Sequence, residues 1–356
     1  MVPRGLLATR VEAVSPSAVT LDAVARAAGV SRATASRVFT GSSQVSEEAR
    51  RAVERAAAEL GYVPNRAARS LAAGRSDSVG VVVLDSGWNV FQDPSFPRLL
   101  HGIGAELSDH GLQMVLFAPQ SKTDSIRLEQ YLAGGHVDGV LIVRLEDHEV
   151  LPQRLQSRGI PVVLGGRPRP GLDISFVHVD NHAGARSATQ HLIEQGRRRI
   201  AHIGGPQHLD LAGDRLQGYR EALWNAALRC DLVEHAEPSR EGGEMAMARL
   251  FNRCEEIDAV FAASDAMAIG AMWVMQALGR RIPEDVAIIG FDDSPPAAAT
   301  QPPLSSVRQP MEDMGREMAR LVLSMTALST HGTLQKVLDP TLTVRESTSR
   351  PVPVPL

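Results

Sequence analysis

The sequence predicts a small all-α head of three short helices, followed by an α/β body of two doubly wound parallel sheets. Three observations lead to this prediction. Residues 19–63 contain three short segments with apolar residues at helical spacing, each preceded by a residue that can cap a helix. From residue 78 onward, short apolar runs alternate with amphipathic stretches, which is typical of parallel α/β sheets. The chain has 356 residues, which is more than one ordinary domain needs.

The composition is typical of a soluble globular protein. Hydrophobic residues make up 44% of the chain and charged residues 22%. The longest apolar runs, such as residues 79–84, have the length of a strand and are too short to span a bilayer. Residues 1–18 contain no hydrophobic stretch, so we expect a disordered leader rather than a signal peptide. Cys230 and Cys254 show no metal-binding spacing, and we expect a reduced cytoplasmic protein without a disulfide, metal or cofactor.

The charge is divided unevenly along the chain. Residues 19–76 contain nine arginines and five acidic residues, a net charge of +4. The leader adds +1, so the total of −4 leaves −9 for residues 77–356. A basic head on an acidic body favours a polyanionic partner for the head alone, although charge by itself does not exclude chance clustering.

The first two helices of the head are expected to be joined by a tight turn. Thr20 can cap a helix over residues 21–28, where apolar residues form one stripe. Gly29 breaks this helix, and Ser31 can cap a second helix over residues 32–39.

The third helix is expected to support the first two. Ser46 can cap residues 47–60, and Gly61 is placed to end that helix. Two short helices joined by a glycine turn and braced by a third form a helix-turn-helix arrangement.

The outward face of the second helix is suited to DNA. Arginine pairs with guanine in the major groove, hydroxyl side chains contact phosphates, and a helix N-terminus attracts an anion. The same pattern also fits a solvated face of a small bundle, and the spacing alone leaves both interpretations open. The outward residues are Arg32, Ala33, Thr34, Ser36 and Arg37.

Residues 19–38, together with residues 45–50 and 61–65, closely resemble the head of the lactose/galactose repressor (LacI/GalR) family. This long ordered match is far more specific than a generic helix-turn-helix pattern. The resemblance implies that Arg32 and Ala33 are the main base readers and that their neighbours contact the DNA backbone or further bases. The expected DNA-binding residues of the head are Thr20, Ser31, Arg32, Ala33, Thr34, Ser36 and Arg37.

Residues 64–76 form the connection between head and body. Pro64 and Gly74 mark a start and a stop, and about eight helical residues between them are too few to be stable alone in water. The residues alone fit a plain linker equally well. The resemblance implies a hinge helix that folds on DNA, with Leu71 as an apolar wedge in the minor groove. Two hinges would pack together, which implies a homodimer and a near-palindromic operator. The expected DNA contacts of the hinge are Asn65, Arg66, Arg69 and Leu71.

The body is expected to alternate strands and helices. The predicted strands are residues 79–84, 113–118, 139–143, 161–164, 200–203, 259–263 and 286–289. The predicted helices include residues 96–110, 181–195, 215–227, 265–278 and 311–326.

Polar residues follow the predicted strands, at the edge where open α/β sheets bind ligands. Carboxylates and guanidinium groups give the paired hydrogen bonds that a polyhydroxyl ligand needs, and nearby aromatic rings could stack on a sugar face. Each of these groups could instead cap a helix or close a turn, and for Asp265 capping and binding are equally good interpretations. The polar candidates after strands are Asp85, Arg144, Arg167, Ser264, Asp265 and Asp292. The aromatic candidates are Phe91 and Phe96.

The body resembles the sensor half of the same family, which is similar to periplasmic sugar-binding proteins. The matching strings are residues 165–168, 179–181, 214–219, 263–268, 290–293 and 302–310. By position, the resemblance implies effector contacts for Arg215, Ser264 and Asp292.

The expected domain organisation follows from these segments. We expect a leader over residues 1–18, a helix-turn-helix domain over 19–63, a hinge over 64–76, an effector-binding and dimerisation domain over 77–347, and a flexible tail over 348–356. The resemblance implies that the two lobes exchange chain. The N-lobe would take residues 77–178 and 308–335, and the C-lobe residues 179–307 and 336–347.

Two other classes of protein fit parts of this pattern. A cytosolic sugar-handling α/β enzyme would need a catalytic or phosphate-binding motif, and we find no glycine-rich fingerprint after a strand, no P-loop and no G-x-S-x-G elbow. A transport-type sugar-binding protein fits the body but has no use for a DNA-reading head. We therefore expect a cytoplasmic, homodimeric repressor, not an enzyme, whose binding to operator DNA is controlled by a sugar.

Overall fold

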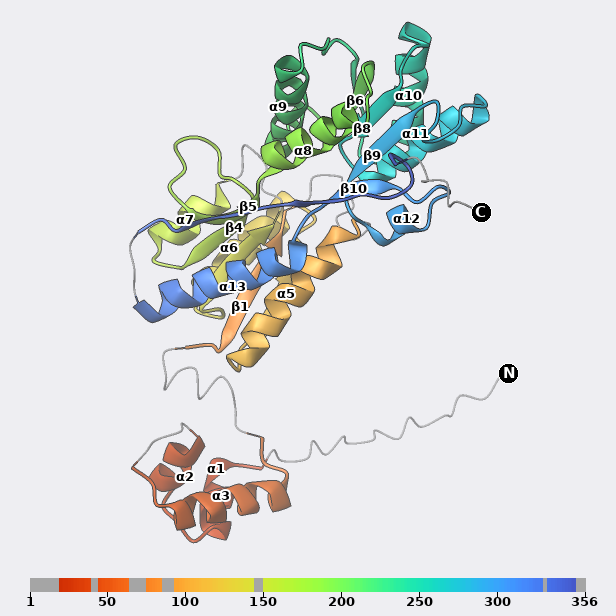
Figure 1. The fold of residues 1–356 in the computed structure, drawn as a ribbon. Coiled ribbons are helices and arrows are strands. Elements are labelled where there is room, and N and C mark those ends of the chain that lie inside the picture. Colours follow the sequence, from red (N-terminus) through yellow and green to blue (C-terminus); the bar gives the residue numbers. More distant parts are fainter. Residues whose placement is uncertain are drawn as a thin grey trace, which may run out of the picture. The chain divides into compact units, whose positions relative to one another are not determined.

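The computed structural model describes residues 19–39, 44–63, 75–84, 93–143, 150–328 and 332–349. It divides into two compact units, residues 1–76 and 77–356 (Figure 1). Several predictions fall outside the described residues: the leader, the hinge helix and the tip of the tail, and with them Asn65, Arg66, Arg69, Leu71, Asp85, Phe91 and Arg144.

The described residues of the first unit form three helices, as predicted: α1 (Leu21–Ala27), α2 (Arg32–Phe39) and α3 (Glu47–Leu60). Capping explains where two of them begin, because Thr20 and Ser46 each accept a hydrogen bond from a backbone N–H in the first turn. Gly61 ends α3 in a left-handed conformation, with φ of 66°. A small apolar core joins the helices, and its buried residues are Val24, Ala25, Ala35, Val38, Val53, Ala56 and Ala57.

The first lobe of the body is a parallel sheet with strand order β11-β5-β4-β3-β1-β2. Its strands are β1 (Ser78–Val83), β2 (Gln113–Phe117), β3 (Gly139–Val143), β4 (Val162–Gly165), β5 (Ser175–Val179) and β11 (Gln335–Leu338). Its helices are α5 (Ser95–Asp109), α6 (Lys122–Ala133), α7 (Leu151–Ser157) and α13 (Met311–Leu328). One apolar cluster packs α5 and α13 against the sheet, and another packs α6 and α7, so helices cover both faces.

The second lobe repeats this architecture with strand order β12-β10-β9-β8-β6-β7. Its strands are β6 (Ile200–Gly204), β7 (Val233–His235), β8 (Ala259–Ala262), β9 (Ala287–Asp292), β10 (Ser305–Arg308) and β12 (Thr341–Thr343). Its helices are α8 (Asn181–Glu194), α9 (Asp210–Asn225), α10 (Arg240–Arg253), α11 (Asp265–Ala277) and α12 (Pro295–Ala298). Only β12 runs antiparallel to its neighbour among the pairs of the described sheets. Apolar clusters pack α8 and α9 on one face and α10 and α11 on the other.

The chain passes between the two sheets after β5, after β10 and after β11. In Figure 1 the dark-blue segment with β11 and β12 runs from one lobe to the other. The return to the second lobe was expected at residue 336, but Lys336 pairs with Val177 in the first sheet, which keeps β11 through Leu338. The return therefore comes after residue 338. The prediction placed it too early because β11 is an exposed edge strand without an apolar run.

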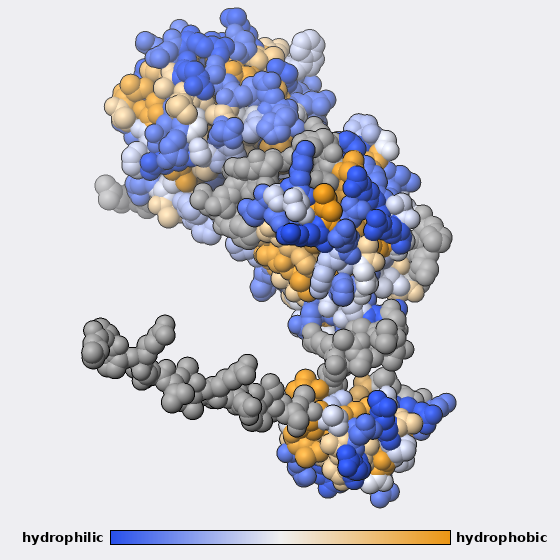
Figure 2. All heavy atoms as spheres, turned by 180° about the vertical axis from the view of Figure 1, so that it is seen from behind, coloured by the Kyte–Doolittle hydropathy of each residue, from blue (hydrophilic) through white to orange (hydrophobic). Residues whose placement is uncertain are grey.

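Polar residues dominate the face of the molecule in Figure 2, with scattered apolar patches. Within the part of the chain that the structure describes, no helix has both the length and the apolar character needed to cross a bilayer.

Candidate functional site

The exposed face of α2 is fixed by burial of its other side. Ala35 and Val38 lie in the core of the head, which leaves Arg32, Ala33 and Arg37 exposed. The remaining two predicted contacts of this helix, Thr34 and Ser36, are half-buried. The predicted DNA-binding residues of α2 therefore share one solvent-facing surface.

The N-terminus of α2 is organised by Ser31. Its Oγ accepts a hydrogen bond from the N–H of Thr34 at 3.0 Å and lies 2.9 Å from the Thr34 hydroxyl. Two hydroxyl groups thus meet at the positive end of a helix, where a phosphate is favoured. Thr20 has the equivalent place on α1, where its hydroxyl oxygen accepts from the N–H of Ala23 at 3.3 Å.

Arg32 lies across from α1. Its Nε is 3.4 Å from a carboxylate oxygen of Asp22, and the two side chains are 72% and 57% exposed. An ion pair this exposed contributes at most about 1 kcal/mol, so it can open at little cost when the guanidinium meets a base.

In the body, Arg215 lies buried at the carboxyl ends of the second sheet. Its Nε donates to Oδ1 of Asn181 at 2.9 Å, its Nη1 donates to the carbonyl of Ala263, and its guanidinium lies 3.7 Å from the ring centre of Phe291. Burial lowers the pKa of Arg215, while the carboxylates of Asp292 and Asp93 act to raise it. Three separate segments therefore hold one cation in place.

Asp292 ends β9 beside this cation. Its Oδ1 accepts a 2.6 Å hydrogen bond from Nε2 of Gln309. Burial raises the pKa of Asp292, and the Arg215 guanidinium acts in the opposite direction. The backbone of Asp292 has φ of 113°, a conformation that costs an L residue about 1–3 kcal/mol and persists mostly at functional sites.

Asp265 is 1% exposed, and both of its carboxylate oxygens have donors within the protein. Oδ2 accepts from the N–H and hydroxyl of Ser294 at 2.7 and 2.8 Å, and Oδ1 accepts from the Ser306 hydroxyl at 2.5 Å. Burial raises the pKa of Asp265, and these hydrogen bonds oppose that rise. The cap of α11 is not Asp265 but Ser264, whose Oγ accepts from the N–H of Met267 at 3.3 Å. Asp265 therefore ties the loop after β9 to α11, which favours a supporting role over ligand binding.

Two other predicted contacts are placed differently than expected. Phe96 is 3% exposed and packs in the apolar core under α5, so the prediction that it stacks on a sugar is wrong for this conformation. Arg167, which follows β4 in the first lobe, forms an ion pair with Asp214 of α9 in the second lobe. Arg167 thus links the lobes directly beside Arg215.

The polar cluster around Arg215 and Asp292 includes three residues that were not predicted from the sequence: Asp93, Asn181 and Gln309. Asp93 precedes α5 and interacts electrostatically with both Arg215 and Asp292, although it belongs to the first lobe. Asn181 and Gln309 lie in strings that match the family, at residues 179–181 and 302–310, which was the available signal. Neither residue is charged or directly follows a predicted strand, so the search at strand ends passed over them.

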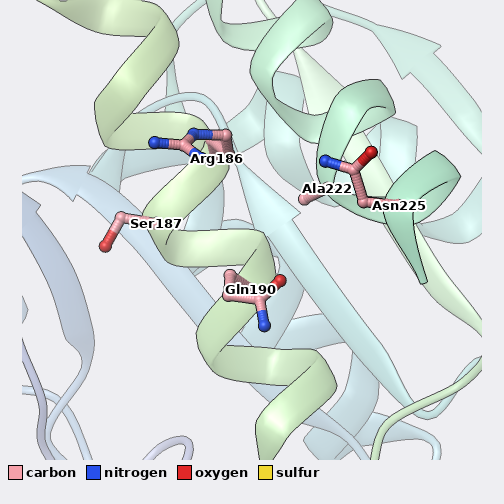
Figure 3. Close-up of a pocket in the computed structure, with 5 residues that line it drawn as sticks. All are labelled: Arg186, Ser187, Gln190, Ala222 and Asn225. Carbon is pink, nitrogen blue, oxygen red and sulfur yellow. The ribbon is translucent and has the colours of Figure 1, made fainter.

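A separate hollow lies between α8 and α9 (Figure 3). It is lined by Arg186, Ser187, Gln190, Ala222 and Asn225. None of these residues belongs to the cluster around Arg215. That cluster combines the fixed guanidinium of Arg215, the carboxylate of Asp292 and the amide of Asn181. This combination of donors and acceptors suits a polyhydroxyl ligand.

Two family models match the chain in the order of its units. The model for bacterial regulatory proteins of the lacI family matches residues 20–65, and the model for the periplasmic binding protein-like domain matches residues 189–348.

Full-length similarity extends to known regulators. The HTH-type transcriptional regulator CelR of Thermobifida fusca is 49% identical over 332 residues, which cover 92% of this chain and 98% of that protein. A solved complex of the transcriptional regulator CelR with cellobiose is 47% identical with a TM-score of 0.72, covering 92% of this chain and 99% of that one. The structure of a lac repressor dimer bound to operator and the anti-inducer ONPF is 26% identical with a TM-score of 0.78, covering 93% and 99%.

Proposed function

This chain belongs to the LacI family of bacterial regulatory proteins, and we propose that it is a transcription regulator whose binding to operator DNA is controlled by a carbohydrate. Its full-length relatives are transcription regulators, and the chain is not an enzyme. We infer that it acts in the cytoplasm, where its DNA partner is found, and that it acts as a repressor.

The observation that carries the DNA-binding proposal is the exposed face of α2. Arg32 is 72% exposed on this face. We propose that it contacts base edges, where a bidentate contact to guanine discriminates by about 1–3 kcal/mol. Ser31 and Thr34 form the hydroxyl pair that would hold a phosphate. In the hinge, we keep the assignment of Leu71 as a minor-groove wedge with Asn65, Arg66 and Arg69 beside it, on the resemblance alone.

We propose cellobiose or a related short glucose oligosaccharide as the effector. The support is the 47% identity to the CelR–cellobiose complex, together with the polar cluster of this chain. Arg215 and Asp292 would bind sugar hydroxyls, with Asp93 approaching from the first lobe. Ser264, Asp265 and Arg167 would support the site through the helix cap, the loop after β9 and the link between lobes.

The proposed control works through the two lobes. Sugar bound between them would rotate one lobe against the other, and the N-lobes of a homodimer would pass this movement to the paired hinges. Separated hinges would leave the minor groove, and operator affinity would fall. We also propose the domain limits given above, with the return of the chain to the second lobe moved beyond Leu338.

The DNA-binding proposal is tested by a mobility-shift titration of the full chain on DNA from upstream of its own gene, with unrelated DNA as competitor. Arg32→Ala should weaken specific binding by about 10-fold or more, consistent with a base contact of ~1–3 kcal/mol. The control is Arg51→Ala, which removes an exposed arginine of α3 that pairs with Glu47. Equal losses in both variants, or no specific binding by the natural protein, would refute the role of α2.

A further inference from the structure

Two adjacent acids, Asp292 at the end of β9 and Asp293 directly after it, have left-handed backbone angles, φ of 113° and 51°. Two consecutive L residues of this kind require compensating contacts. The compensation is found in their side chains, which bind consecutive residues of the segment that leads from β10 into α13. Asp293 binds Arg308, and Asp292 binds Gln309.

Asp293 holds two connections between the lobes at once. Its Oδ2 accepts from Nε of Arg308 at 2.6 Å, and its Oδ1 accepts from Nη2 of Arg345 at 2.6 Å. Arg308 is the last residue before the chain leaves for the first lobe, and Arg345 follows β12 after the chain has returned. Burial acts to raise the pKa of Asp293, but the two arginines outweigh it and hold that pKa below its ordinary value. The buried Asp293 carboxylate therefore pins both connections to the second lobe.

Asp292 makes the next contact along the same connection, and it belongs to the proposed sugar site. Its bond from Gln309 is 2.6 Å long, and α13 begins two residues later at Met311. A surface hollow lies along this connection, with Arg98, Pro310 and Thr341 among its lining residues, so the segment is not packed solidly on that side.

The start of α13 is tightly joined to α5. A Cβ on Gly102 would lie 2.0 Å from the carbonyl oxygen of Glu312, and a Cβ on Gly315 would lie 2.2 Å from that of Leu99. The two helix backbones thus touch without side chains between them, and a shift at the start of α13 must carry α5 with it.

We propose that Gln309 is the positioning residue that couples the sugar site to the first lobe. Its amide fixes the start of α13 to Asp292, while Asp293 keeps Arg308 and Arg345 as a stationary pivot. A ligand that engages Asp292 changes the position of Gln309 and, through α13 and α5, the orientation of the first lobe. This inference rests on the proposed function and adds to it the residue through which sugar binding is transmitted.

The test separates sugar binding from the response to sugar. In the full chain, Gln309→Leu should lose at least about tenfold of the cellobiose-induced change in operator affinity, measured at cellobiose concentrations that calorimetry shows to saturate the variant. Gln309→Glu, which places a second carboxylate beside Asp292, should lose the response in the same way. Amides of residues 311–316 should exchange hydrogen faster in both variants without ligand.

The matched control is Gln276→Leu. The Gln276 amide donates a 2.7 Å hydrogen bond to the carbonyl of Gln301, a bond of similar length that lies away from the connections. This control should retain both cellobiose binding and the response. A Gln309→Leu variant that responds fully at saturating cellobiose overturns the coupling role, and so does a variant that shows no measurable cellobiose binding. A natural protein that ignores both operator and carbohydrate overturns the proposed function, and this inference with it.

Discussion

Nε of Arg215 donates a 2.9 Å hydrogen bond to Oδ1 of Asn181, which joins the middle of α9 to the first residue of α8. Arg215 is buried, so each of its donors needs a partner inside the protein. Asn181 holds Nε of Arg215 and therefore determines the direction in which the other N–H groups of the guanidinium point. An uncharged residue that no charge pattern indicates thus determines how the cation of the proposed sugar site is presented.

The first prediction follows from this contact. Asn181→Ala leaves a buried guanidinium donor unpaired, which costs about 1–3 kcal/mol and should weaken cellobiose binding by roughly 10-fold or more. Operator affinity without sugar should stay unchanged, because the head is untouched. Calorimetry and DNA titration measure the two quantities. Gln190→Ala serves as control, since Gln190 lies on the same helix and its exposed amide donates to Glu194. Unchanged cellobiose affinity in Asn181→Ala would remove Arg215 from the sugar site.

The second prediction concerns the contact of α5 with α13. Gly102→Ala would place a methyl group 2.0 Å from the carbonyl oxygen of Glu312, so the helices must separate and the melting temperature should fall by several degrees. Gly104→Ala on the same helix meets only Met114 Cε at 3.9 Å. It should be neutral or stabilising by about 0.5–1 kcal/mol, because alanine favours a helix. Equal melting temperatures for the two variants would contradict the close approach of these helices.

The third prediction uses His202, which is fully buried between the rings of Tyr219 and Phe261. Burial lowers its pKa from 6.5 to about 3. Between these values the unfolded chain binds a proton at this position and the folded chain does not, so the stability contributed by neutral His202 is lost as the pH falls from 6.5 toward 3.

His202→Phe should therefore lose less stability than the natural protein over that interval, and the gap between their melting temperatures should narrow as the pH falls. The variant also lacks the 2.9 Å contact of the imidazole Nδ1 with the carbonyl of Phe261, a difference that does not depend on pH over this range. His208→Phe, in an exposed turn, is the control and should follow the natural protein. A constant gap for His202→Phe would argue that the buried imidazole is not kept neutral.

The fourth prediction addresses the hinge. Leu71→Ala should weaken binding to the operator while leaving binding to unrelated DNA, and its salt dependence, almost unchanged. The reason is that a wedge acts only where the minor groove opens, whereas non-specific binding depends on phosphate contacts. Anisotropy titrations on both kinds of DNA at several salt concentrations measure the difference. Equal loss on both would show that Leu71 has no wedge role.

Much of the fold was predictable because its signals are local. Thr20 and Ser46 cap helices of the head where the sequence places them, and buried runs such as residues 79–84 and 139–143 form central strands. The edge strands β11 and β12 were missed, whereas the edge strand β2 was predicted. β11 and β12 have exposed or half-buried side chains and are defined by pairing with distant strands, which no local pattern encodes.

The site was predictable only in part. Asp292 was indicated by its place at a strand end and Arg215 by the family resemblance, and the structure brings them together. Gln309 joins them from the connection after β10, and Asp93 acts on them from the first lobe, so their roles depend on topology rather than on local sequence. Phe96 was placed wrongly although a signal existed. It falls on the same helical stripe as Leu99, Ile103 and Leu107, which predicts a core position.

The central claim is that a carbohydrate bound in the body changes how tightly the head holds DNA. The most direct test is one anisotropy titration of the full chain on DNA from upstream of its own gene, repeated at saturating cellobiose. The account predicts specific binding that weakens by at least about tenfold with cellobiose, which is within the usual range of allosteric coupling. An operator Kd that stays the same with cellobiose and with every other carbohydrate tried would contradict it.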